Sequence, residues 1–191
     1  NEEMEQYGSA KKYLNIVLIQ LKEDSDTSKT YESINKTLNR IVALDLKMKN
    51  YNDAILNLKS LEQNYEQSND IIGLTSVYNN LALINKKSND DIRSKAYFNK
   101  CYYIVKFDKN SNLSDDKKAT ILLNLGVVNL ELNENESAYK YLKEAYDIRI
   151  QQNNSTEIAR VRNYLGLYFY LKGDQNQAYG QVKKRTADIT A

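Results

Sequence analysis

The chain has 191 residues, of which 27% are charged, six are glycine and none is proline. This composition favours continuous helices joined by short turns, and it argues against a β-sandwich or barrel, which needs frequent turn residues. The net charge is only +2, and the one basic run is Lys183, Lys184 and Arg185. We therefore expect no nucleic-acid binding by this chain, because nucleic-acid-binding proteins concentrate positive charge on one face. No stretch approaches the roughly 18–20 apolar residues of a membrane span, so we also expect no membrane insertion.

Apolar residues recur at helical spacing along almost the whole sequence. This pattern predicts helices separated by short polar turns and linkers. The expected helix ranges are 2–23, 28–48, 51–67, 71–88, 90–107, 115–132, 135–152, 156–172 and 175–188.

Three of the turns contain the spacing of a capping box, or a close variant of it. In that motif a side chain accepts a hydrogen bond from the backbone of the helix that it precedes, and it stands three residues before an acid or an amide. Gly173 is expected to end its helix in the left-handed conformation. The expected capping pairs are Asn50 with Asp53, Asn133 with Glu136, and Asp174 with Gln177.

Two series of small residues run through the chain with the same spacing. Successive members of both series are 40, 44 and 40 residues apart, and each member of the first follows an aliphatic residue. Two series with one irregular spacing predict a repeated pair of helices, and a repeat of this length is typical of an α-solenoid. Small residues leave room where two helices cross closely. The first series is Val42, Ala82, Gly126 and Gly166, and the second is Ala54, Ser94, Ala138 and Ala178.

The repeats predict a single all-α domain over residues 1–191, a right-handed superhelical α-solenoid of antiparallel helix pairs. The first helix is expected to cap the array or to belong to a truncated repeat, because Ala10, Leu14 and Val17 match the pattern of the helix at 51–67. The four extra residues of the 44-residue step are placed in the linker at 109–114. The expected parts are the N-terminal helix at 1–24 and four repeats at 28–68, 70–108, 114–152 and 155–188.

At these positions the chain resembles the tetratricopeptide repeat family. The pairs Leu125-Gly126 and Leu165-Gly166 and the small residues of the second series stand at signature positions of that family. The usual aromatic residue of the first helix is present only as Tyr78, and the closing proline is absent. The repeat of about 40 residues, against the usual length of about 34, resembles arrays in bacterial signalling proteins, which often precede a histidine kinase or a DNA-binding output domain. The resemblance covers residues 28–188.

Residue types that carry catalysis or bind metals are missing or have structural explanations. The chain has no histidine, and its single cysteine, Cys101, stands at another small position of the repeat, where burial is expected. No glycine-rich phosphate loop is present. The acid pairs at 90–91 and 115–116 stand at expected helix starts, where the helix dipole favours them, and the three glutamates at 131–136 are expected on a solvated turn. We therefore expect no enzyme, no cofactor and no metal site.

The resemblance implies a binding groove, because the first helix of each pair lines the concave surface in such arrays. Residues three before, one after and four after the small residue share one helical face. They predict an apolar floor edged by amides, which suits the main chain of an extended peptide. The alternative is that the asparagines only reflect composition, since the chain has 24 of them. The predicted groove residues are Asn39, Asn79, Leu83, Lys86, Val127, Leu130, Asn163, Leu167 and Tyr170.

Chaperone-binding members of the family hold a peptide carboxylate with lysine and asparagine at set groove positions. That clamp is not reproduced in this sequence, so we expect no binding to an acidic chaperone tail. The matching positions include Asn39, Ala43, Asn80, Leu83 and Leu123.

We expect a non-catalytic module that binds a protein or peptide segment in its concave groove. The alternative is a sensory or dimerising domain of a bacterial signal-transduction regulator, either a histidine kinase or a transcription factor, whose output domain lies outside this chain. A third possibility is a structural array whose apolar face is buried by self-association, for example in a homodimer. We expect a cytoplasmic protein, or a periplasmic one if the chain is a processed fragment.

Overall fold

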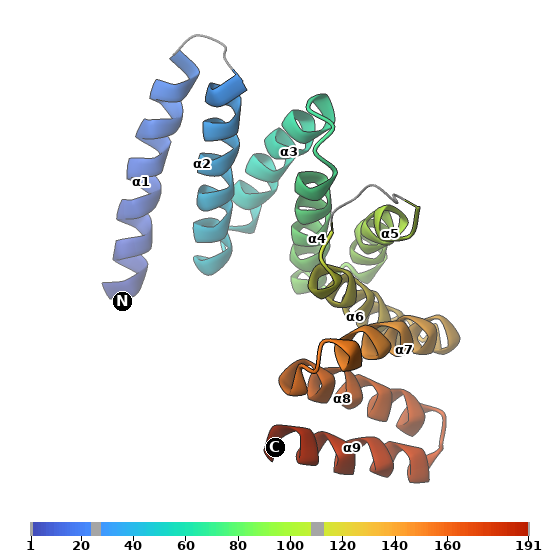
Figure 1. Cartoon of the computed structure of the whole chain (residues 1–191). Coiled ribbons are helices and arrows are strands. Elements are labelled where there is room, and N and C mark those ends of the chain that lie inside the picture. Colours follow the sequence, from blue (N-terminus) through green and yellow to red (C-terminus); the bar gives the residue numbers. More distant parts are fainter. Residues whose placement is uncertain (1, 24–27, 108–112, 191) are drawn as a thin grey trace. The chain divides into compact units, whose positions relative to one another are not determined.

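The computed structural model describes residues 2–23, 28–107 and 113–190, and their side chains over 2–23, 29–107 and 113–185. All regular structure in these ranges is helical, which confirms the predicted all-α class. Each predicted helix boundary lies within two residues of the observed one (Figure 1). The helices are α1 (Glu2–Glu23), α2 (Ser28–Lys47), α3 (Tyr51–Gln67), α4 (Ile71–Lys87), α5 (Asp91–Phe107), α6 (Asp115–Glu131), α7 (Asn135–Gln151), α8 (Ser155–Leu171) and α9 (Gln175–Thr190).

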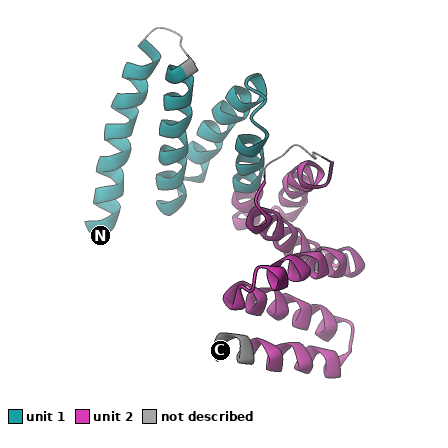
Figure 2. Ribbon diagram, viewed as in Figure 1, with its two compact units in different colours: residues 1–81 teal, residues 82–191 magenta. Residues whose placement is uncertain are grey.

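The chain divides into two compact units, and the boundary between them falls within the sequence of α4 (Figure 2). In unit 1, residues 1–81, α1 packs on α2 and α2 packs on α3. In unit 2, residues 82–191, each helix from α5 to α9 packs on the next, and α6 also contacts α8. Among the described residues, every helix is too short or too polar for a membrane span. The grouping of the whole chain into one domain of four repeats stays a prediction.

The three-residue turns between described helices share one backbone geometry. After α6, Asn133 has a φ of 59°, its N–H donates to the carbonyl of Leu130 at 3.0 Å, and the N–H of Glu134 donates to the carbonyl of Asn129 at 2.8 Å. These two bonds define the Schellman motif, which satisfies the last carbonyl groups of a helix. The corresponding left-handed residues within the described ranges are Lys49, Asn69, Asn89, Asn133, Asn153 and Gly173.

The spacing of these left-handed residues explains the length of the repeat. Neighbouring positions are 20 residues apart, except across the longer connection between α5 and α6. The helices α3 to α8 have 17 residues each, and three residues complete each short turn. Each 40-residue repeat is therefore two helix–turn units of equal length. Asparagine at four of the six positions fits this geometry, because its side chain tolerates the left-handed conformation better than most.

The predicted capping residues are partly wrong. Asp174 does accept a hydrogen bond, from the Gln177 N–H at 3.0 Å, and Gly173 ends α8 with a φ of 79° as predicted. Asn50 precedes α3, but its side chain makes no cap hydrogen bond. Asn133 is not a cap, because it is the left-handed residue that ends α6 and Glu134 stands at the N-cap of α7. Side-chain caps that the capping-box search missed are Asp70, Asp90, Ser114 and Asn154.

The longer connection lies where the 44-residue step predicts it. Helix α5 ends at Phe107 and α6 begins at Asp115, so seven residues join them where three join the other neighbours from α2 to α9. Residues 108–112 of the predicted linker lie outside the described residues. The N-terminal helix departs from the predicted pattern in one respect, because Ala10 is exposed whereas its counterpart Ala54 is fully buried.

The small-residue series lie in the core, except for Ala178, which is half-buried. In unit 2, α6 and α7 cross closely at Gly126. A Cβ added to Gly126 would lie 2.6 Å from Cγ and Cδ2 of Leu142 and 3.4 Å from the carbonyl oxygen of Ala138. Leu142 and Ala138 are fully buried, so an added methyl group cannot displace them into solvent. At the equivalent Gly166 the nearest atoms, the carbonyl oxygen of Ala178 and the Cβ of Gln181, are each 3.6 Å from an added Cβ.

These two glycines give a matched test of the crossing. We expect Gly126→Ala to lower the free energy of unfolding by about 1–3 kcal/mol, because the methyl group overpacks against Leu142. Gly166→Ala should raise it by up to about 1 kcal/mol, since alanine favours the helix and the space is sufficient. Urea unfolding followed by far-UV circular dichroism measures both. Equal effects of the two substitutions would contradict the assigned packing.

The reactivity of the Cys101 thiol gives a second test of the packing in unit 2. Its side chain is fully buried, and desolvation raises the pKa of its thiol to about 12. The reactive thiolate is therefore scarce in the folded protein at about pH 8, whereas an unfolded cysteine has a pKa of about 8.5. We expect a thiol reagent to label the native protein only at the rate of unfolding and the urea-unfolded protein at once. Rapid labelling of the native protein would show that the thiol is accessible.

Candidate binding groove

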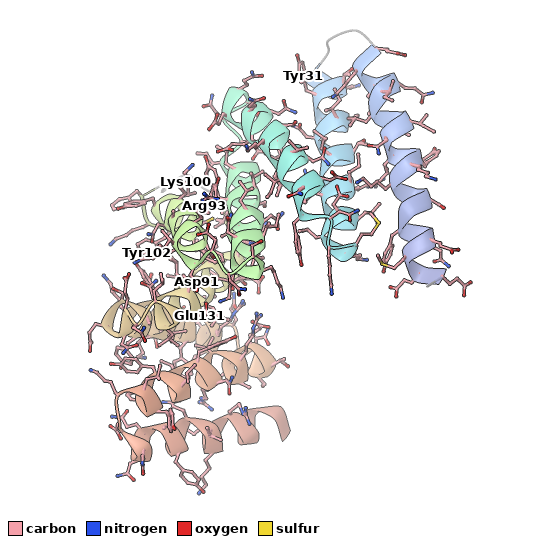
Figure 3. The ribbon with its side chains drawn as sticks, turned by 180° about the vertical axis from the view of Figure 1, so that it is seen from behind. Tyr31, Asp91, Arg93, Lys100, Tyr102 and Glu131 are labelled. Atoms are coloured by element: carbon pink, nitrogen blue, oxygen red, sulfur yellow. The ribbon has the colours of Figure 1, made fainter. Side chains whose placement is uncertain are left out.

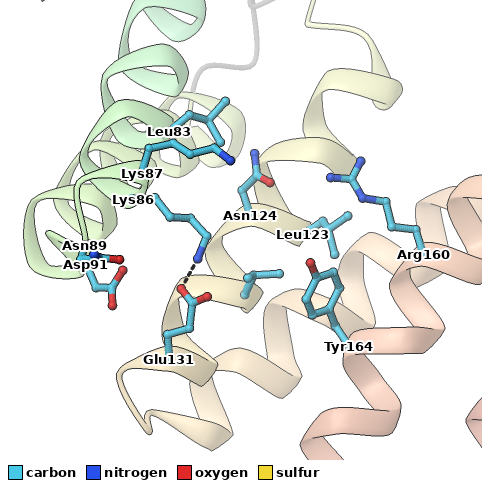
Figure 4. A pocket seen from close by; sticks show the side chains of 11 residues that line it. Leu83, Lys86, Lys87, Asn89, Asp91, Leu123, Asn124, Glu131, Arg160 and Tyr164 are labelled. Carbon is cyan, nitrogen blue, oxygen red and sulfur yellow. Dashed lines mark hydrogen bonds and ion pairs between the residues drawn. The ribbon is translucent and has the colours of Figure 1, made fainter. Parts of the chain in front are cut away.

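One face of unit 2 is hollowed, and residues from the C-terminal end of α4, from α6 and from α8 line the hollow. The cavity has a volume of about 570 Å³ and opens to solvent (Figure 4). The contact between α6 and α8 places the first helices of two successive pairs side by side, so that both contribute to this face. We call this cavity the groove. Its lining residues are Leu83, Lys86, Lys87, Asn89, Asp91, Leu123, Asn124, Val127, Glu131, Arg160 and Tyr164.

The floor of the groove is apolar. Leu123 and Val127 are four residues apart on α6 and therefore share one helical face. Leu123 is buried, Val127 is half-buried and Leu83 from α4 is 37% exposed. Apolar side chains that remain open to solvent in a concave surface favour a ligand that covers them.

The rim of the groove carries both signs of charge. Lys86 of α4 forms an ion pair with Glu131 of α6 across the groove (Figure 4). Lys87 is exposed, and Arg160 of α8 has a long contact of 3.7 Å to Glu157. With Asp91, the lining comprises three cations and two anions. The rim is therefore slightly positive, and it favours an acidic group over a basic one.

The structure places three of the predicted groove residues in this cavity, namely Leu83, Lys86 and Val127. Leu130 is buried, with 5% of its surface exposed, so it offers little contact to a partner. Leu167 and Tyr170 are 43% and 67% exposed on α8 but do not line the cavity.

The three predicted asparagines are also outside the cavity. In unit 1, the Nδ2 of Asn39 donates to the carbonyl of Asn35 at 2.8 Å and to the hydroxyl of Tyr65 at 2.7 Å. Asn79 is half-buried in the same unit. In unit 2, the Oδ1 of Asn163 accepts from Arg185 at 3.1 Å. Hydrogen bonds within the chain thus occupy Asn39 and Asn163 in part.

Sequence reasoning missed several polar residues of the groove, chiefly Lys87, Asn124, Arg160 and Tyr164. Asn124 and Tyr164 both stand two residues before the small glycine of their helix. That position lies three residues before the position that holds Val127, so it belongs to the same face. The sequence signal that could have identified Asn124 and Tyr164 is therefore this repeated position, two residues before the glycine.

The glutamates of the α6–α7 turn are each paired with a lysine. Glu131 pairs with Lys86, Glu134 with Lys95, and Glu136 with Lys172 at 2.6 Å. These lysines come from α4, from α5 and from the end of α8, so the pairs tie the turn to three other helices. Exposed pairs of this kind contribute about 0–1 kcal/mol each. No group of three His, Cys, Asp or Glu suited to a metal occurs in the described part of the chain.

The paired acids at the helix starts also have structural partners. Asp90 caps α5 through the N–H of Arg93 at 3.0 Å. Asp116 forms an ion pair with Arg149, whose side chain is only 1% exposed. Arg149 also donates to the hydroxyl of Thr120 at 2.8 Å and lies 3.5 Å from Glu157. This buried guanidinium therefore joins α6, α7 and α8, a role that the sequence pattern did not indicate.

Comparison with known proteins gives a family match and a set of similar folds. Residues 75–104 and 119–149 each match the model of the tetratricopeptide repeat. The first match covers parts of α4 and α5, and the second covers parts of α6 and α7, which are two of the predicted helix pairs. No curated protein matches the sequence.

Solved structures share the fold at low sequence identity. The structure of BtubC (BKLC) from P. vanneervenii has a TM-score of 0.84 and 15% identity, over 99% of this chain and 75% of that one. The apo form of RapI has a TM-score of 0.70 and 11% identity, over 99% and 80%. A thermophilic TPR protein of Thermus thermophilus has a TM-score of 0.52 and 18% identity, over 93% and 91%. Residues 75–104 and 119–149 are therefore tetratricopeptide repeats, and the described chain has the all-α helical-repeat fold of that family.

Proposed function

We propose that this chain is a non-catalytic interaction module that binds a protein or peptide segment in the groove of unit 2. The observation that carries this proposal is the apolar floor of Leu83, Leu123 and Val127, which is open to solvent at Leu83 and flanked by polar side chains. Tetratricopeptide repeats supply such surfaces without catalytic groups. The match of the family model at two helix pairs supports this class of function.

The chemistry of the groove favours a segment with one apolar side chain next to an acidic one. The apolar side chain covers Leu83 and Val127, which removes their exposed surface from water. The acidic group lies near Lys87 and Arg160, the two cations that do not pair across the groove. The hydroxyl of Tyr164 on α8 adds a donor and an acceptor for the main chain of the ligand.

The exposed side chains Leu167 and Tyr170 extend this surface along α8 in the proposal. A longer segment would contact them after it leaves the groove. The asparagines Asn39, Asn79 and Asn163 and the buried Leu130 contribute less, since they lie outside the cavity. A cytoplasmic location and the absence of nucleic-acid binding belong to the same proposal.

A dimerising domain is the second candidate function. It is favoured by the outer face of α1, where Tyr13, Ile16 and Ile19 follow one another at intervals of three residues and are 67%, 56% and 58% exposed. Residues at this spacing share one helical face. Light scattering over a range of protein concentrations tests this candidate, with a concentration-dependent dimer in favour and a monomer throughout against it.

The groove proposal predicts a defined pattern of binding defects. Peptides are first selected on the wild-type chain from a display library, and their affinity is then measured by fluorescence anisotropy. We expect Leu83→Asp to weaken binding at least about tenfold, which corresponds to about 1.4 kcal/mol, because it places a charge on the apolar floor. Lys87→Glu together with Arg160→Glu should weaken acidic peptides and spare neutral ones.

The matched control is Ile150→Asp, since Ile150 is 45% exposed on α7 and lies outside the groove. It should leave the affinity unchanged, and all variants should keep the helicity of the wild type by circular dichroism. Wild-type affinity in a folded Leu83→Asp variant would show that the selected peptides bind elsewhere, and the groove would not be the site.

A further inference from the structure

A second cavity lies in unit 2, between α5 and α7 and over α6. Its volume is about 400 Å³. Asn129 of α6 lines it, whereas Val127 lines the groove. Two residues along a helix correspond to a rotation of about 200°, so the two cavities use opposite faces of α6. We call this second cavity the crevice.

The crevice contains a buried acceptor that lacks a donor. Asn129 is 1% exposed, and its Nδ2 donates to the carbonyl of Leu125 at 2.7 Å. That bond fixes the orientation of the amide, because the reverse orientation would place Oδ1 against the Leu125 oxygen. Oδ1 has no hydrogen-bond partner among the described residues. A buried acceptor without a donor is unfavourable, so the site favours a ligand that brings an N–H group.

The walls of the crevice are aromatic. Tyr103 and Phe107 stack on α5 with their ring centroids 5.7 Å apart, and they are 62% and 65% exposed. Tyr102, which also projects from α5 (Figure 3), meets Tyr141 of α7 edge to face at 5.0 Å. An exposed, stacked pair of rings beside a cavity provides a flat apolar surface. Such a surface favours a planar apolar ligand, because aromatic rings prefer offset-stacked and edge contacts.

The charged groups of the crevice favour an oxygen acceptor and disfavour a cation. Lys95 forms an ion pair with Glu134, and the Nζ of Lys106 lies 5.5 Å from the ring centre of Tyr102 and 5.6 Å from that of Phe107. With two lysines and one glutamate, the lining has one excess positive charge. Both ammonium groups can donate to a neutral oxygen acceptor.

We propose that the crevice is a binding site for a small aromatic carboxamide. Its NH₂ group donates to Oδ1 of Asn129, its carbonyl accepts from a lysine of the rim, and its ring packs on Tyr103 and Phe107. The acceptor, the lysine donors and the aromatic surface of the site thus match the NH₂ group, the carbonyl group and the ring of such a ligand. This site shares no residue with the groove, so it stands or falls independently of the proposed function.

Benzamide is the probe, and acetophenone is its matched control because a methyl group replaces the NH₂ group. ¹⁵N-labelled protein is titrated with each compound, and the side-chain NH₂ signal of Asn129 and the backbone signals of Tyr103 and Phe107 are followed by NMR. We expect benzamide to shift these signals in a saturable way and to bind at least about tenfold more tightly than acetophenone. No shift up to the solubility limit of benzamide, or equal affinity for both compounds, overturns the proposal.

Two variants separate the acceptor from the ring surface. Asn129→Leu keeps the approximate shape and removes Oδ1, so it should abolish the preference for benzamide over acetophenone. Phe107→Ala alters an exposed side chain and should weaken both compounds without unfolding the protein. The matched control is Tyr179→Ala on α9, because Tyr179 is 70% exposed and lies outside the crevice. Equal loss of binding in Tyr179→Ala and Phe107→Ala would also contradict the assigned site.

Discussion

The close crossing of α6 and α7 at Gly126 is the contact on which unit 2 depends. Leu142 occupies the volume that a Cβ at position 126 would need. This arrangement lets the two backbones approach, and the buried side chains of both helices then make their dispersion contacts. The equivalent crossing of α8 and α9 at Gly166 leaves more space. The same position of the repeat therefore holds a glycine at both crossings, and the crossing at Gly126 is tighter than the one at Gly166.

This packing leaves one cavity on each of two opposite faces of α6. On one face, Val127 and its neighbours from α4 and α8 form the groove, and on the other, Asn129 lies below the aromatic side chains of α5 and α7. The paired glutamates of the α6–α7 turn and the buried Arg149 tie α6 to the surrounding helices. Both cavities therefore have floors on a well-packed helix, and their rims consist of side chains that can adapt to a ligand.

The sequence predicted the helices and the buried small positions, because apolar spacing and repeat period are local properties of the chain. It failed at Asn133, since the offset of three residues to Glu136 does not distinguish an N-cap from a left-handed residue that ends the previous helix. The 20-residue spacing of the asparagines at the turns held that information. For the groove, the face of a single helix was enough to predict Leu83, Lys86 and Val127, which line the cavity. Arg160 could not be predicted in this way, because its place in the lining depends on how far its long side chain extends from α8. The crevice needed the tertiary structure, because its residues come from three helices.

A double-mutant cycle at the central crossing tests this account most directly. Gly126→Ala and Leu142→Ala are made singly and together, and the free energy of unfolding is measured for all four proteins. If the added methyl group meets Leu142, Gly126→Ala should cost at least about 1 kcal/mol less in the Leu142→Ala background than in the wild type. The same cost in both backgrounds would mean that Leu142 does not limit the approach of α6 and α7, and the crossing would need another explanation.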